Sequence, residues 1–160
     1  MNFPHRYTPS TRMRRMRRDA FSRQLMQENT LTVKDLILPV FILEGHNVEQ
    51  DVTSMPGVKR LSLDKLFYTC EECVELGIPL IDLFPADLNN KNLMAEEAYN
   101  PDGLVPTAIR EIRARFPDLG VMTDVALDPY TTHGQDGIID DEGYVVNDIT
   151  IEVLIKQSLW

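Results

Sequence analysis

Hydrophobic residues along the chain alternate between short continuous runs and runs with helical spacing. Residues 36–42 form a near-continuous apolar run of strand length, as expected for a strand buried on both faces. A loop with turn residues at Pro56 and Gly57 follows. Ser62 then precedes apolar residues at helical spacing, which predicts a helix capped by the Ser62 side chain and ended by Gly77. The predicted apolar face consists of Leu63, Leu66, Phe67, Cys70 and Val74.

The same succession of elements occurs twice more. Residues 80–84 and 120–127 predict a second and a third strand. A second helix is predicted to begin at Pro101, with Asn100 as its N-cap. Its apolar face consists of Val105, Ala108, Ile109, Ile112 and Phe116. A loop of about 20 residues precedes a third helix near residue 148. The apolar face of that helix consists of Ile151, Leu154, Ile155 and Leu159.

Three successive βα units imply parallel strands joined by right-handed crossovers. A doubly wound α/β sheet and a (β/α)8 TIM barrel both begin in this way. The sequence contains neither Gly-x-Gly-x-x-Gly nor a Walker A loop, so the nucleotide-binding versions are disfavoured. The last predicted helix reaches Trp160 without a glycine cap or a polar exit. We therefore expect the chain to be the first part of a longer protein.

Charge is distributed unevenly along the 160 residues. The chain has 16 Lys and Arg, 25 Asp and Glu, and a formal net charge of −9, yet residues 1–23 hold seven arginines, Arg6 among them, and one acid, Asp19. We expect a basic N-terminal arm, residues 1–30, followed by an acidic body, residues 31–160. Such an arm docks either on another copy of the chain or on an external polyanion such as a nucleic acid.

Cysteine content and hydropathy favour a cytoplasmic protein. No apolar run approaches the length of a membrane span, and the N-terminus lacks the apolar core of a secretory signal. Cys70 and Cys73 have C-x-x-C spacing but lie within the first predicted helix. We expect buried, reduced thiols there, with a redox or zinc site as the alternative.

The densest set of chemically active residues follows the third predicted strand. Asp124 stands in an otherwise apolar run, where a carboxylate needs a partner or a raised pKa. Asp128, His133 and Asp136 follow in the long loop, at the edge where parallel α/β folds form their active sites. Alternatively, Asp128 and Asp136 cap turns, and His133 is a hydrogen-bonded turn residue. The acidic spacing does not fit an EF-hand.

Residues 124–137 closely resemble the metal-loop region of the porphobilinogen synthase (5-aminolevulinate dehydratase) family. Further agreement lies at residues 12–15, 38–45, 54–58 and 97–103. The resemblance covers essentially the whole chain and roughly the first half of a family member. It implies the first three βα units of a (β/α)8 TIM barrel, preceded by an extended arm that contacts a neighbouring subunit in a homo-octamer. It also implies a lyase of tetrapyrrole and heme biosynthesis, which condenses two 5-aminolevulinate molecules to porphobilinogen with loss of two waters.

The resemblance assigns roles to particular residues. Asp124 matches the family's strand-end acid near the substrate amino groups, so we expect it to orient substrate and handle protons. Thr132 and His133 are expected to bind substrate in the same wall. The family forms Schiff bases on two lysines, and none of the lysines of this chain lies in those motifs. These lysines are Lys34, Lys59, Lys65, Lys91 and Lys156. This chain alone is therefore expected to be inactive.

The metal loop differs from that of the zinc-dependent relatives. Their three cysteines match Ala126, Asp128 and Asp136, and one methyl group with two carboxylates does not suit zinc. We therefore expect no catalytic zinc. Magnesium or potassium is the cation expected for this aspartate-rich branch, with Asp128 and Asp136 as ligands and water completing a weak site. The branch's allosteric magnesium site uses an acid outside these residues.

Two functions of other classes remain open on the sequence alone. One is a non-catalytic assembly module that associates with full-length subunits through the arm. The other is an acidic, cation-binding barrel fragment without lyase activity. In each case neither nucleic acid nor membrane is the expected partner. A pair of lysines in later barrel strands would favour the enzyme.

Overall fold

The structure is a computed structural model that describes residues 12–159, so Arg6 of the basic arm and Trp160 lie outside the description. The chain divides into two units, Met1–Thr32 and Val33–Trp160. The first contains two short helices, α1 (Arg15–Arg18) and α2 (Ala20–Met26). The Arg23 guanidinium donates to the carbonyls of Arg17 (3.1 Å) and Arg18 (2.8 Å) at the end of α1. Several large apolar side chains of this unit are exposed: Met13, Met16, Phe21, Leu25, Met26 and Leu31.

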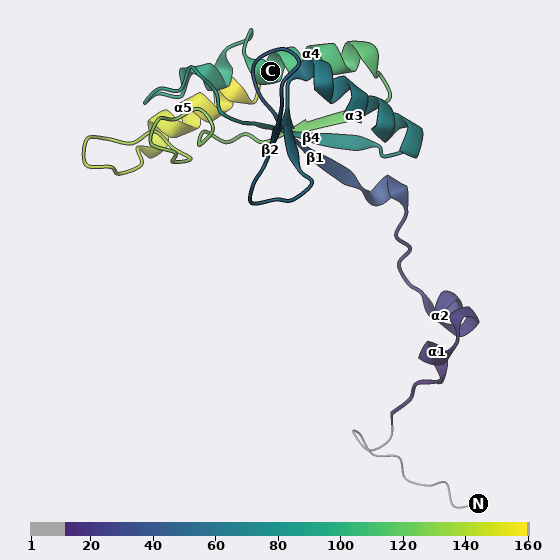
Figure 1. Ribbon diagram of the computed structural model, residues 1–160. Helices are drawn as coiled ribbons and strands as arrows, with labels where there is room; N and C mark the ends of the chain where they lie inside the picture. The colour runs from purple at the N-terminus through teal and green to yellow at the C-terminus, as the bar shows by residue number, and fades with distance from the viewer. Residues whose placement is uncertain (1–11, 160) are drawn as a thin grey trace, which may run out of the picture. The chain divides into compact units, whose positions relative to one another are not determined.

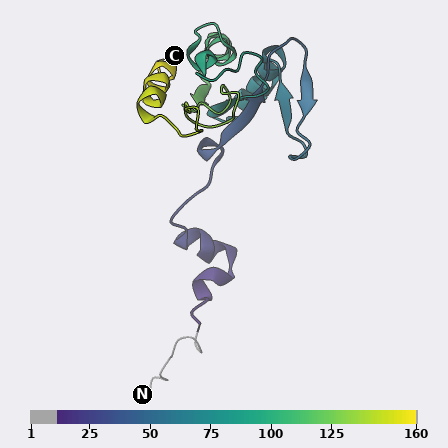
Figure 2. The same cartoon turned by 90° about the vertical axis from the view of Figure 1, so that its left-hand side faces the viewer.

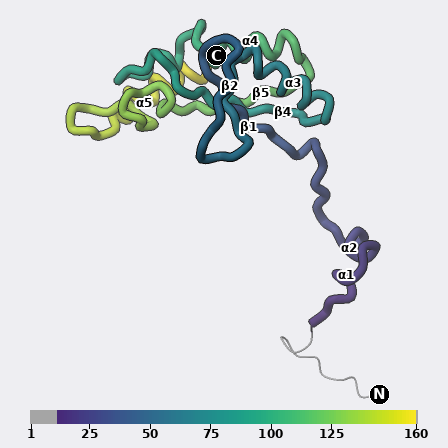
Figure 3. The backbone as a smooth tube through the Cα atoms, in the orientation of Figure 1, coloured from purple at the N-terminus to yellow at the C-terminus, as the bar shows by residue number. Residues whose placement is uncertain are grey.

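The second unit is built on a five-stranded sheet with the order β2-β3-β1-β4-β5. The strands are β1 (Ile37–Ile42), β2 (Glu49–Asp51), β3 (Lys59–Leu61), β4 (Leu80–Pro85) and β5 (Gly120–Thr123). A short 3₁₀ helix, η1 (Val33–Asp35), precedes β1. The strands β3, β1, β4 and β5 are parallel, and β2 is antiparallel to β3. Figure 3 shows β1, β4 and β5 side by side.

Helices α3 (Leu63–Leu76) and α4 (Leu104–Arg115) cover the same face of the sheet (Figure 1). Every second strand residue packs against them. The resulting buried core includes Val40, Ile42, Ile81, Leu83, Leu66, Cys70, Ala108 and Ile112. A doubly wound sheet would place its helices on both faces. Helices on one side only are the arrangement of a (β/α)8 barrel, in which all helices lie outside. The structure therefore confirms the predicted α/β class and its three βα units.

A second core cluster lies beyond the sheet. It joins a 3₁₀ helix, η2 (Glu96–Tyr99), to helix α5 (Asn147–Gln157), which Figure 2 shows in yellow. Its buried residues are Leu88, Ala95, Ala98, Leu127, Tyr130, Ile138 and Val153. Because these residues come from the segments that follow β4 and β5 and from α5, the cluster fixes both segments at the carboxyl edge of the sheet.

The first strand is buried on one face rather than two. Val40 and Ile42 are buried, but Ile37 is 50% exposed and Pro39 is also exposed. The prediction of burial on both faces is wrong for the face that carries Ile37 and Pro39, because the helices cover only the opposite face. The predicted loop around Pro56 contains the β2–β3 hairpin. The hydrophobic pattern did not predict these two strands because they are short and polar.

Two predicted helix starts differ in detail. Ser62 occupies the N-cap of α3 but makes no side-chain cap; its Oγ accepts from the Val48 N–H (2.9 Å) and donates to Asp64 Oδ1 (2.7 Å). Helix α4 begins at Leu104, not at Pro101, with Gly103 as its N-cap. The cause is Asn100, whose Oδ1 accepts from the Asp102 N–H (3.1 Å) and holds these residues in a turn.

The third strand and the third helix also differ from prediction. The strand ends at Thr123, so Asp124 follows it and lies outside it. In α5 the buried residues are Thr150 and Val153, whereas Ile151 is 45% and Ile155 is 55% exposed. The preceding loop selects this face, because the Ile138 N–H donates to Thr150 Oγ1 (2.9 Å).

Burial in the described unit predicts unequal costs for two truncations on α3. Leu66 is fully buried, so Leu66→Ala should lower the free energy of unfolding by about 2–5 kcal/mol. Val74 is 49% exposed although its spacing placed it on the apolar face, so Val74→Ala should change the stability by no more than about 0.5 kcal/mol. Urea unfolding of both variants measures the difference. Equal losses would contradict the observed orientation of α3.

Candidate active site at the carboxyl edge of the sheet

Asp124 lies at the carboxyl edge of the sheet, directly after β5, and is exposed to solvent. The expectation of a carboxylate inside a strand is therefore corrected, because the backbone leaves the sheet one residue earlier. Asp124 lines a cavity of about 90 Å³ together with Thr123, Tyr130 and Gln157. Gln157 Nε2 donates to the Ala126 carbonyl (3.0 Å), and this bond ties α5 to the residues after Asp124. Burial raises the pKa of Tyr130 to about 12, so its hydroxyl keeps its proton at neutral pH.

A second carboxyl, that of Asp82, lies in the middle of β4. Sequence reasoning did not select it, although it stands in an apolar strand run, which is the signal that selected Asp124. The residue is 9% exposed, and its Oδ1 has no hydrogen-bond partner among residues 12–159. Burial, and then the charge of Asp124, raise the pKa of Asp82.

Asp128 and Asp136 are brought together by the long loop after β5. Partial burial, a side-chain hydrogen bond with Asp136 and the Asp136 charge raise the pKa of Asp128, while Lys91 acts in the opposite direction. The long loop therefore holds the Asp136 carboxyl close enough to Asp128 to disfavour the charged form of Asp128. Two adjacent carboxyls are oxygen donors of the kind that magnesium prefers. No group of three or more metal-ligating side chains occurs in the part of the chain that is described.

Thr132 and His133 lie in the same loop as Asp128 and do not line the cavity beside Asp124. The backbone of Thr132 is fixed to the loop after β4, because its N–H donates to the Asn92 carbonyl (3.3 Å). His133 Nδ1 accepts from the Gln135 N–H (3.2 Å), which is the turn role that the sequence allowed. His133 Nε2 is buried and has no partner within residues 12–159. Since Nδ1 accepts, the neutral imidazole carries its proton on Nε2, which is a donor without a partner within residues 12–159.

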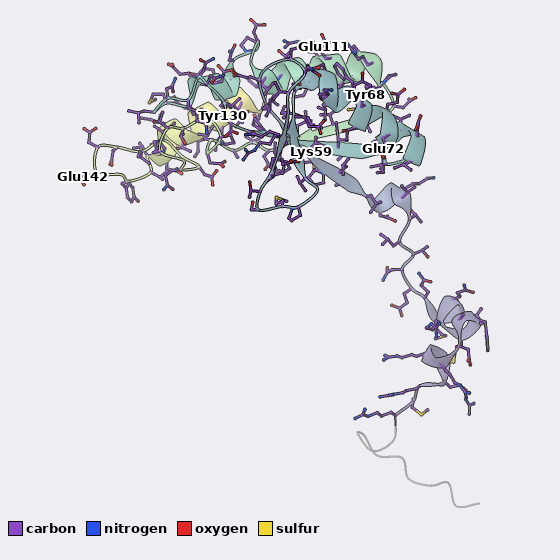
Figure 4. The ribbon with its side chains drawn as sticks, in the orientation of Figure 1. Lys59, Tyr68, Glu72, Glu111, Tyr130 and Glu142 are labelled. Atoms are coloured by element: carbon purple, nitrogen blue, oxygen red, sulfur yellow. The ribbon has the colours of Figure 1, made fainter. Side chains whose placement is uncertain are left out.

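The remaining acids of the loop belong to its tip. Asp140 Oδ1 accepts from the backbone N–H groups of Glu142 (3.0 Å) and Tyr144 (2.9 Å), which makes it a turn residue. Figure 4 shows Glu142 at the end of this projection, well apart from Tyr130. The chemistry of the site therefore concentrates between Asp124 and Asp136.

The C-x-x-C pair is structural. Cys70 and Cys73 are free, buried thiols within α3. Burial raises the pKa of Cys70 to about 12 and also raises that of Cys73, so neither thiol forms a thiolate at neutral pH. None of the helices between residues 12 and 159 is long and apolar enough to span a membrane.

Comparison with known proteins relates this arrangement to one group of enzymes. The family model described as "Delta-aminolevulinic acid dehydratase" matches residues 10–160. A protein of that name from Bradyrhizobium diazoefficiens is 46% identical over 149 residues, which are 92% of this chain and 42% of the relative. The chloroplastic protein of Selaginella martensii is 42% identical, over 94% of this chain and 36% of the relative.

A solved structure gives the same relationship. The delta-aminolevulinic acid dehydratase of Toxoplasma gondii, in complex with the reaction product porphobilinogen, superposes with a TM-score of 0.88. It is 42% identical, and the match covers 98% of this chain and 44% of that one. The chain thus spans less than half the length of these three relatives.

The Asp128–Asp136 pair predicts a specific dependence of stability on pH. Because the pKa of Asp128 is raised above its ordinary value of 3.8, the folded state binds more protons than the unfolded state. The free energy of unfolding should therefore fall as pH rises from about 3.8 through the raised pKa. Asp136→Asn should flatten this decline by removing the neighbouring charge. Urea unfolding across this pH range measures it, with Asp141→Asn in the same loop as control. Parallel curves for Asp136→Asn and wild type would contradict the pairing.

Proposed function

The chain belongs to the delta-aminolevulinic acid dehydratase family, and on that premise we propose that it forms the N-terminal part of a porphobilinogen synthase. The complete enzyme would condense two molecules of 5-aminolevulinate to porphobilinogen with loss of two waters, in heme biosynthesis. The match of nearly the whole chain to enzymes of this name is the observation that carries the proposal. The two lysines of the family's Schiff bases are proposed to lie in the rest of that enzyme, because none of the lysines of this chain falls in those motifs.

Asp124 is the residue of this chain that we assign to catalysis. It is an exposed carboxylate at the carboxyl edge of the sheet, where βα loops form active sites. A carboxylate there attracts the substrate ammonium group, orients it, and accepts or returns a proton during the condensation. Thr132 and His133 are proposed to bind substrate through the Thr132 hydroxyl and the His133 Nε2–H donor.

Asp128 and Asp136 are proposed to hold a hard cation, magnesium, rather than zinc. The adjacent carboxyls support this because magnesium takes oxygen ligands and retains several waters. A zinc site would require thiolates, and Ala126, Asp128 and Asp136 supply none. Such a cation would lower the pKa of Asp128, because its positive charge favours the carboxylate.

The basic arm is proposed to contact another copy of the chain in a homo-oligomer. Its exposed apolar residues, such as Phe21 and Leu25, and its arginines support this, because the rest of the chain is acidic. No nucleic acid or membrane partner is proposed. The buried, reduced cysteines support a cytoplasmic location. Sedimentation tests this contact: the protein without residues 1–30 should form a smaller assembly than the protein with the arm.

The role of Asp124 is tested by Asp124→Asn in the full-length protein. The amide keeps the shape of the side chain but removes its charge and basicity, so kcat should fall by about 10²–10⁴-fold. Because the side chain is exposed, the melting temperature should change little. A colorimetric pyrrole assay and thermal unfolding on one preparation measure both quantities. Near-normal turnover with a markedly lower melting temperature would assign Asp124 a structural role instead.

The choice of cation is tested by metal removal. After dialysis against a zinc-selective chelator, the full-length enzyme should keep most of its activity, and added magnesium should increase it. Ala126 is the reason, since it replaces a thiolate ligand by a methyl group. Loss of activity that only zinc restores would contradict the proposal.

A further inference from the structure

Asp82 lies near the proposed catalytic acid. Its neighbours Ile81 and Leu83 pack under α3 and α4, so the Asp82 side chain lies on the opposite, uncovered face. In register it pairs with Pro39 on β1 and Met122 on β5. Asp124 follows Met122 by two residues, just past the end of β5, and its charge contributes to the raised pKa of Asp82, so the two carboxyls lie within electrostatic reach of each other. Asp82 thus lies within β4, and Asp124 lies at the carboxyl end of the neighbouring strand β5.

The Asp82 carboxyl lacks the groups that normally compensate a buried charge. It is 9% exposed, and Oδ1 has no hydrogen-bond partner among residues 12–159. No Lys or Arg in that range forms an ion pair with Asp82 or Asp124. Across the sheet it meets a proline ring and a thioether, neither of which donates a hydrogen bond. An uncompensated buried carboxylate is costly, so Asp82 calls for a cationic partner that the described residues do not supply.

The surroundings favour an organic ammonium group over a metal ion. A magnesium ion retains several waters that need polar surroundings, whereas the neighbours of Asp82 across the sheet are a proline ring and a thioether. An ammonium group needs three acceptors, which two carboxyls provide. The apolar neighbours of Asp82 on the same face, Pro39, Met122 and Phe84, suit the carbon chain attached to such a group.

We propose that Asp82 and Asp124 together bind one primary ammonium group of the substrate, with Asp82 as a further substrate-binding residue. This inference rests on the proposed function, in which 5-aminolevulinate carries an amino group beside its keto carbon. Asp124 would contact the ammonium from the carboxyl edge of the sheet, and Asp82 from within β4. The second carboxylate would therefore select amine-bearing substrates over otherwise identical keto acids.

The test compares two ligands that differ only in the amino group. In the full-length enzyme, Asp82→Asn should raise the KM for 5-aminolevulinate about tenfold, the effect of losing one charged hydrogen bond. The inhibition constant of levulinate, which lacks the amino group, should stay within about twofold of wild type because levulinate makes no such bond. Asp118→Asn, an exposed acid before β5, is the matched control and should alter neither constant.

Two results would decide against Asp82. Equal increases in both constants would show a packing role, and an unchanged KM would show no role. If Asp82→Asn fails to fold, Asp82→Ala removes the carboxyl without leaving an unpaired amide, and the same ratio is measured. Absence of porphobilinogen formation by the wild type would overturn the proposed function instead. Equilibrium binding of the two ligands to wild type and variant would still give the ratio that decides the role of Asp82.

Discussion

The packing of α3 and α4 against a single face of the parallel sheet determines where the chemistry of this chain lies. Side chains alternate between faces along a strand, so the residues beneath the helices are apolar and those opposite them are free to be polar. Val40, Ile81 and Leu83 therefore form the core, while Asp82 occupies the other face. In a closed barrel this second face would point inward, where the strands of all units meet.

The loops at the carboxyl edge depend on a smaller, separate core. Leu127, Tyr130 and Val153 join the loops after β4 and β5 to α5. The backbone pairing of Asn92 with Thr131 and Thr132 links these loops directly. This support fixes Asp128 and Asp136 at the ends of a turn-rich segment and allows two carboxyls to approach each other despite their charge. Packing among residues outside the site thus positions Asp128 and Asp136, the candidate metal ligands.

The sequence was sufficient where burial and periodicity agree. The apolar runs of β1, β4 and β5 and the helical spacing around Leu66 and Ile112 predict the three βα units, and the motif at residues 124–137 identified the family. Prediction from the sequence failed where local hydrogen bonds override the hydrophobic spacing. The turn at Asn100 moves the start of α4 to Leu104. The hydrogen bond of Thr150 with the preceding loop buries the face of α5 that carries Thr150 and Val153, rather than the predicted apolar face. Asp82 carries the same signal as Asp124, a carboxylate in an apolar run, but only the strand register pairs it with Met122, two residues before Asp124.

The central claim is that this chain supplies one part of a porphobilinogen synthase and that the lysines of the reaction come from the remainder. Its most direct test is the conversion of 5-aminolevulinate, assayed as pyrrole formation, by the 160-residue chain and by the full-length protein under the same conditions. We predict one porphobilinogen for every two substrate molecules from the full-length protein, and none above background from the chain alone. Turnover by the purified chain, or its absence from the full-length protein, would contradict the account.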